Sequence, residues 1–112
     1  YIYPPTVFDI IKTQPKQSQI ALYSIIKNYE SKKKVFTGDI YDFYKDTCLK
    51  TGLTPLTQRR VSDIIAELDM LGIINAKVVS KGRYGRTREI GIAIPSSSLN
   101  KIEGLLKEGL GL

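Results

Sequence analysis

The apolar positions of the chain follow two different periods. From Val7 to Leu71 they recur every three or four residues, which is the spacing of helices that bury one face. From Ile74 to Ile94 they alternate with other positions, as in strands that are buried on one side. We therefore predict one domain over residues 1–112 that is mainly α with a small antiparallel β-hairpin, an α+β fold in which a final helix follows the hairpin.

Two helices are predicted before the first strand. A short one carries Val7, Ile10 and Ile11 and stops before Pro15, because a proline disfavours helical geometry in the residue that precedes it. The second begins at Pro15 and continues to the lysines at positions 32–34. A lysine run at a helix end is usually solvated, so we expect no specific contact from it.

A very short strand and a third helix are expected next. Val35 and Phe36 form the strand, and either Thr37 or Asp39 caps the helix that follows. Gly52 is expected to end that helix in the left-handed conformation.

A tight connection leads from Gly52 to a fourth helix, which Thr57 is expected to cap and Gly72 to close. The buried stripe predicted for this helix consists of Val61, Ile64, Ile65, Leu68 and Leu71. Two helices joined by a short turn and followed by a hairpin are the order of a winged helix-turn-helix, whose second helix can enter a DNA major groove.

The hairpin is predicted from two strands around a glycine-containing loop. Ile74, Ala76 and Val78 alternate in the first strand, and Ile90, Ile92 and Ile94 alternate in the second. After Pro95, the serines at positions 96–98 are expected to cap the final helix.

The first turn of the fourth helix carries the candidate base-reading residues. The forked donors of Arg and Gln match the edges of guanine and adenine, and helix amino-terminal amides favour phosphate. Arginines at this end oppose the helix dipole, so helix stability is not their evident purpose. The alternative is that Arg59 and Arg60 are solvated or pair with Asp63 and Glu67. Asp63 itself repels phosphate, so it either orients an arginine or reads cytosine.

The hairpin loop is the most basic part of the chain. Five cations and no acid occur between Lys77 and Arg88, which indicates a polyanionic partner. An arginine in a narrow minor groove, or bonded to the flanking phosphates, is the expected use. Tyr84 could equally contact DNA or pack on its own hairpin, and Gly82 and Gly85 suit the turn with or without DNA.

Composition excludes several other classes of protein. The chain has one cysteine, Cys48, and no histidine, so neither an internal disulfide nor a common zinc site is expected, and the compartment is expected to be reducing and cytoplasmic. The same absences make an enzyme an unfavoured prediction. The net charge of +6 favours a nucleic-acid partner, and no apolar run approaches the ~20 residues of a membrane span. Six tyrosines lie mostly at amphipathic positions, which predicts packing in the core or at its edge and disfavours a stacking platform for single strands. They are Tyr1, Tyr3, Tyr23, Tyr29, Tyr41 and Tyr44.

Several stretches resemble one known family. Leu56–Ile65 and Glu67–Ile74 are similar to the archaeal origin-recognition and cell-division-control initiators of replication, and so is Ala76–Ile90. The segment Thr37–Tyr41 resembles them more loosely. The resemblance covers only the carboxy-terminal winged-helix domain of that family, so we expect this chain to be a fragment of a longer protein whose AAA+ ATPase module is absent from it.

The resemblance also implies particular contacts and partners. The recognition helix would lie in the major groove of double-stranded origin DNA and the wing in the adjacent minor groove. The recognition-helix residues implicated are Thr57, Gln58, Arg59, Arg60 and Ser62, and the wing residues implicated or adjacent are Lys81, Arg83, Tyr84, Gly85, Arg86, Thr87 and Arg88.

The parent protein would be an ATP-dependent, nucleoid-associated initiator that meets other initiator copies and the replicative helicase. The resemblance also implies ATP and magnesium in the ATPase module. This sequence itself has no glycine-rich phosphate loop with Lys-Ser or Lys-Thr, so it shows no sign of a nucleotide site of that kind. No cofactor is expected in this chain, and the isolated domain is expected to be a monomer. Two alternatives stay open, a dimeric winged-helix transcriptional regulator and a winged helix that binds an acidic protein surface.

Overall fold

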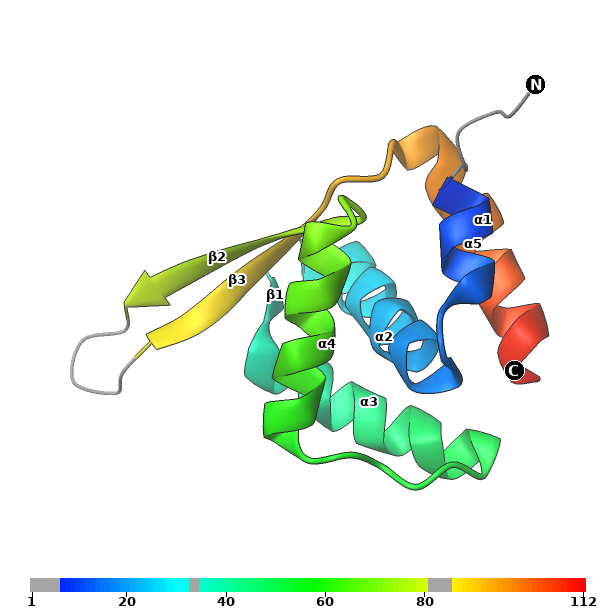
Figure 1. Cartoon of the computed structure of the whole chain (residues 1–112), viewed down its shortest axis with the longest axis horizontal. Helices are drawn as coiled ribbons and strands as arrows, with labels where there is room; N and C mark the ends of the chain where they lie inside the picture. Colours follow the sequence, from blue (N-terminus) through cyan, green and yellow to red (C-terminus); the bar gives the residue numbers. More distant parts are fainter. Residues whose placement is uncertain (1–6, 33–34, 81–85) are drawn as a thin grey trace.

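The computed structural model describes residues 7–32, 35–80 and 86–112 (Figure 1). In chain order the elements are α1 (Val7–Thr13), α2 (Lys16–Lys32), β1 (Val35–Phe36), α3 (Thr37–Thr51), α4 (Gln58–Met70), β2 (Ile74–Ser80), β3 (Arg86–Ile92) and α5 (Ser96–Leu110). The predicted mainly helical fold with a small antiparallel hairpin is confirmed, and the very short strand at Val35–Phe36 is present.

Helix α2 lies at the centre of the helical part. It contacts α3, α4 and α5 as well as β1 and β3, which explains why its apolar residues are almost fully buried. Ile20, Ile25 and Ile26 have no exposed surface. At about 25 cal/mol per Å² of apolar surface, burying side chains of this size is the main stabilising contribution to the fold.

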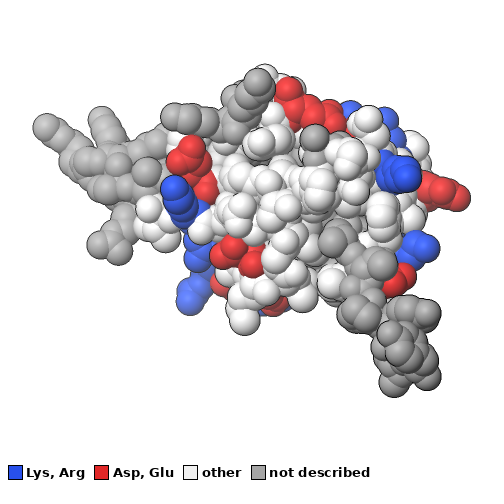
Figure 2. All heavy atoms as spheres, turned by 90° about the horizontal axis from the view of Figure 1, so that it is seen from above, with Lys and Arg blue, Asp and Glu red and all other residues white. Residues whose placement is uncertain are grey.

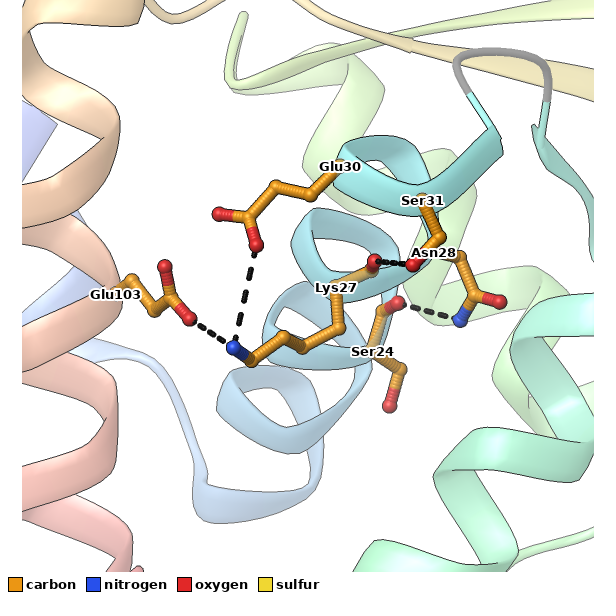
Figure 3. Close-up of polar contacts among 6 residues, drawn as sticks. All are labelled: Ser24, Lys27, Asn28, Glu30, Ser31 and Glu103. Carbon is orange, nitrogen blue, oxygen red and sulfur yellow. Dashed lines mark hydrogen bonds and ion pairs between the residues drawn. The ribbon is translucent and has the colours of Figure 1, made fainter.

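Helix α5 is tied to α2 by a cluster of charged side chains (Figure 3). The Lys27 ammonium forms an ion pair with Glu103 of α5 and lies 3.9 Å from a carboxylate oxygen of Glu30. The same ammonium lies 5.8 Å from the ring centroid of Tyr23. We call this set the α2–α5 cluster. Since α1 lies alongside α5 in Figure 1, the cluster supports the side of the molecule away from the hairpin.

Helix ends follow local sequence in some places and tertiary structure in others. Gly52 and Gly72 have φ of 76° and 78°, the left-handed conformation expected after a helix. The prediction that Thr37 or Asp39 caps α3 is wrong, because the extended Phe36 of β1 occupies the N-cap position without a side-chain cap. The hydroxyl of Thr37 instead donates to the carbonyl of Arg88 at 3.5 Å.

The predicted serine cap of α5 is also wrong. Pro95 holds the N-cap position, no side chain caps the helix there, and the amide of Ser98 donates to the Pro95 carbonyl at 2.9 Å. A proline with its φ already near the helical value turns the chain into α5, so Ser96 lies inside the helix.

The three strands form one antiparallel sheet in the order β1-β3-β2. Ile74 pairs with Ile92 and Ala76 with Ile90, so apolar residues share one face. The hairpin then extends beyond the helices, as Figure 1 shows. For this reason Val78 is 62% exposed although it continues the alternation. Leu71, predicted in the buried stripe of α4, is likewise 41% exposed because it lies at the C-cap, past the last helical turn.

Candidate nucleic-acid interface

The turn between α3 and α4 is held in place by two tyrosine hydroxyls. The hydroxyl of Tyr44 accepts a hydrogen bond from the amide of Leu56 at 3.0 Å, and that of Tyr41 donates to the carbonyl of Leu56 at 3.0 Å. The side-chain amide of Gln17 in α2 donates to the carbonyl of Thr54 at 3.0 Å. Since Leu56 directly precedes the cap of α4, these contacts determine where α4 begins. We call them the turn clamp.

Tyr44 is the buried centre of the turn clamp. Its hydroxyl also donates to the side-chain carbonyl of Gln17, so it serves as donor and acceptor at once. Burial raises the pKa of Tyr44 from its ordinary value of 10.0 to about 12, so the hydroxyl stays protonated even in moderately alkaline solution. Sequence analysis predicted packing for Tyr41 and Tyr44 but missed their hydrogen bonds, because an apolar position in a helix carries no signal for a hydroxyl partner.

Thr57 caps α4 as predicted. Its side-chain oxygen accepts the amide of Arg60 at 3.3 Å, which satisfies one of the unpaired amides of the first turn. The first turn contains no acidic residue, and Gln58, Arg59 and Arg60 are exposed while Ser62 is half-buried. The structure therefore brings all five recognition-helix candidates to one helix end, where backbone amides and cations face outward together.

The cations of this first turn differ in their partners. Arg60 lies 3.9 Å from Asp63, and these side chains are 65% and 59% exposed, so the pair is of the weak helical kind worth ~0.2–0.5 kcal/mol. The side chains of Gln58 and Arg59 form no hydrogen bond or ion pair with any residue that the structure describes. The alternative of intramolecular pairing thus applies to Arg60 and leaves Arg59 available.

The wing candidates are described only in part. Lys81, Arg83, Tyr84 and Gly85, together with Gly82, lie outside the described residues. The backbones of Arg86 and Thr87 lie in β3 opposite Ser80 and Val79, and their side chains are outside the description.

The two cations at the base of the wing have neighbours in the protein. Arg88 donates from Nη1 to the carbonyl of Ser62 in α4 at 2.9 Å. Lys77 lies opposite Glu89, so an acid neighbours this cation across the strands. The basic character inferred from the sequence therefore increases from the base of the hairpin toward its loop.

The surface at the carboxy-terminal end of α4 differs in charge from the surface at its start. Figure 2 looks onto the end where α4 finishes, and there the acidic and basic groups are interspersed around an uncharged centre. Among the described residues, no group of three or more His, Cys, Asp or Glu side chains could hold a metal ion. None of the described helices has the length and apolar character needed to cross a membrane.

A helix-turn-helix formed by α3 and α4, followed by a projecting hairpin, defines the chain as a winged helix-turn-helix domain. The family described as the C-terminal winged helix domain of CDC6 matches residues 9–102. The chain belongs to this family, that of the ORC1/CDC6 initiators of replication, as the resemblance predicted.

Curated relatives agree with this assignment. An ORC1-type DNA replication protein of Pyrococcus furiosus is 53% identical over 95 residues, which cover 84% of this chain and 23% of that protein. ORC1-type DNA replication protein 1 of Archaeoglobus fulgidus is 50% identical over 95 residues, 85% of this chain and 23% of that protein. The chain thus spans about a quarter of the length of these relatives.

Two solved structures have a similar fold. The Aeropyrum pernix ORC1 protein, solved in complex with DNA, superposes with a TM-score of 0.80 at 39% identity and covers 91% of this chain and 26% of its own. Cdc6p of Pyrobaculum aerophilum gives a TM-score of 0.78 at 16% identity, covering 95% of this chain and 26% of its own, and supports the fold alone.

Proposed function

We propose that this domain binds double-stranded DNA at replication origins, with the start of α4 in the major groove and the β2–β3 wing in the adjacent minor groove. The observation that carries the proposal is the exposed first turn of α4. There Gln58 and Arg59 have no partner among the described residues, while the turn clamp holds the helix that bears them. The DNA complex of the Aeropyrum pernix relative supports the same class of partner.

Each residue of the first turn has a distinct role in this proposal. Arg59 and Gln58 read base edges through forked donors, and Thr57 and Ser62 lie close enough to the helix start to bond phosphate or a base. Arg60 is held lightly by Asp63 and can turn to a phosphate at little cost. Lys81, Arg83, Tyr84, Gly85, Arg86 and Thr87 supply the wing contact.

The test is the affinity of the domain for origin and random duplexes, measured by fluorescence anisotropy over a range of salt concentrations. We expect Arg59→Ala to reduce discrimination between the duplexes by about 1–3 kcal/mol, and Arg83→Ala to weaken binding to both. Lys101→Ala removes the same charge from an exposed position of α5, a helix outside the proposed DNA-binding elements, and should change neither value. Equal effects of Arg59→Ala on both duplexes would show that α4 does not read bases.

The proposal extends to the protein of which this domain is a part. We infer an ATP-dependent initiator that uses ATP and magnesium in an AAA+ module outside these 112 residues and that meets other initiator copies and the replicative helicase. This domain itself would contribute DNA binding and no catalysis, and in isolation it would be a monomer. Light scattering separates this proposal from a dimeric transcriptional regulator, and failure to bind any duplex at low salt would favour a protein-binding winged helix.

A further inference from the structure

Arg88 is the wing cation whose contact the structure shows. It lies in β3 opposite Val78, and its guanidinium reaches across to α4, where Nη1 donates to the carbonyl of Ser62 at 2.9 Å. A carbonyl inside a helix has a second lone pair, so this bond can form without breaking the helical ladder. A hydrogen bond from a charged donor is also stronger than a neutral one.

A second hydrogen bond joins the other wing strand to the same helix. The amide of Ala76 in β2 donates to a carboxylate oxygen of Asp69 in α4 at 3.3 Å. Ser62 and Asp69 are seven residues apart, so they lie on the same side of α4, two turns or ~10 Å from each other. One bond therefore holds β3 and the other holds β2, at two separated points along the helix.

Two hydrogen bonds at separate points of α4 fix the angle between the wing and this helix, whereas a single bond would let the wing rotate about it. Already at the level of Arg88 the hairpin has little apolar support from the helices, since the residue opposite it, Val78, is 62% exposed. From there the strands project away from the helical part (Figure 1). The orientation of the wing relative to α4 therefore depends on packing at Ile74 and Ile90 and on these two bonds.

We propose that Arg88 and Asp69 are positioning residues that set the angle between the wing and α4, so that the two elements reach adjacent grooves together. Arg88 then acts within the protein and does not neutralise a phosphate. The inference rests on the proposed function for its consequence, while the geometric part is independent of DNA. It assigns a role to Asp69, an acid that DNA contact would not favour.

The geometric part is tested without DNA. Spin labels at Lys77→Cys in the wing and Glu67→Cys on α4 report the distance between the two elements, and Cys48 is buried. We expect Arg88→Met and Asp69→Ala to broaden the distance distribution and Asp69→Asn, which keeps an acceptor oxygen, to restore it. An unchanged distribution in Arg88→Met would overturn the inference whether or not the domain binds DNA.

The functional part compares Arg88→Met with Arg86→Met, the same change two residues away in the same strand. A lost phosphate contact lowers the slope of log K against log salt by about 0.9. We expect that loss for Arg86→Met on random duplex and no loss for Arg88→Met, whose affinity for origin duplex falls roughly tenfold at constant salt. A slope reduced by Arg88→Met as much as by Arg86→Met would make Arg88 a phosphate contact. If Arg88→Met does not fold, the comparison of Asp69→Ala with Asp69→Asn still tests whether the bonds between the wing and α4 set the angle of the wing.

Discussion

The start of α4 and the α2–α5 cluster use charged side chains in opposite ways. In the cluster, Lys27 pairs with Glu103, whose side chain is only 12% exposed, and a second carboxylate and an aromatic ring lie nearby. At the start of α4, Arg60 has one distant and exposed partner, and Arg59 has none among the described residues. Charges that are satisfied inside the molecule stabilise the helices, and charges that are not are available to a partner.

The titration behaviour of the cluster shows how closely its members interact. The hydrogen bond from Lys27 lowers the pKa of Glu103, and the hydrogen bond to Glu103 raises the pKa of Lys27. Burial, followed by the neighbouring Glu103 carboxylate, raises the pKa of Glu30. The ionised form of Glu103 therefore stabilises the fold relative to its protonated form, and the ionised form of Glu30 destabilises it, although both carboxylates face Lys27 (Figure 3).

The largest expected effect comes from removing the support beneath the exposed end of α4. Tyr44→Phe leaves the amide of Leu56 without its partner and removes the hydroxyl that donates to the side-chain oxygen of Gln17, and a buried polar group left unpaired costs about 1–3 kcal/mol. Urea denaturation should show this loss in the free energy of unfolding. Tyr29→Phe is the matched control, because Tyr29 is half-buried with no hydrogen bond to a described residue, and it should change stability little. Equal losses in the two variants would mean that the hydrogen bonds of the Tyr44 hydroxyl add nothing to stability.

The helix boundaries show which features the sequence could predict. Gly52 and Thr57 were predicted correctly because a left-handed turn and a cap depend on a few adjacent residues. The cap at Thr37 was predicted incorrectly because the strand before it enters α3 with Phe36 extended, and that strand exists only through pairing with β3.

The candidate site was likewise predictable only where its residues are close in sequence. Thr57 to Ser62 occupy one helix end, so period and charge sufficed to bring them together. The bond from Arg88 to Ser62 spans 26 residues and the bond from Tyr41 to Leu56 spans 15. Such contacts depend on how the elements pack, which one sequence with no structure does not specify.

The next effect in size concerns the α2–α5 cluster. Glu103→Gln weakens the pairing of Lys27, and because both side chains keep some solvent contact we expect a loss of about 1 kcal/mol or less at pH 7. DNA affinity should not change, since the cluster joins α2 to α5 and includes no residue of α4 or the wing. The measurement is urea denaturation with duplex binding in parallel. A loss of DNA binding without a loss of stability would contradict the separation of the two regions.

The pH dependence of stability sharpens the same comparison. The pKa of Glu103 is lower in the fold, so its contribution is present above its ordinary value of 4.5 and is lost as pH falls through the lower folded pKa. The pKa of Glu30 is raised, so its protonation on acidification favours the fold. Between pH 6 and pH 3, Glu103→Gln should therefore lose less stability than the parent, and Glu30→Gln at least as much as the parent. Parallel curves for the parent and Glu103→Gln would show that the Lys27 pair does not contribute to acid denaturation.

The smallest effect is expected at the exposed pair of α4. Asp63→Asn removes the partner of Arg60, yet at 3.9 Å and well over half exposed this pair should contribute less than ~0.5 kcal/mol to stability. Removing an acid near the proposed DNA surface should strengthen binding to random duplex by less than about threefold, because salt screens the repulsion over ~8 Å. If Asp63 only orients Arg60, origin and random duplexes gain alike. If Asp63 reads cytosine, Asp63→Asn weakens binding to the origin duplex while binding to the random duplex still improves. Fluorescence anisotropy on both duplexes therefore distinguishes an Asp63 that only orients Arg60 from one that itself contacts a base.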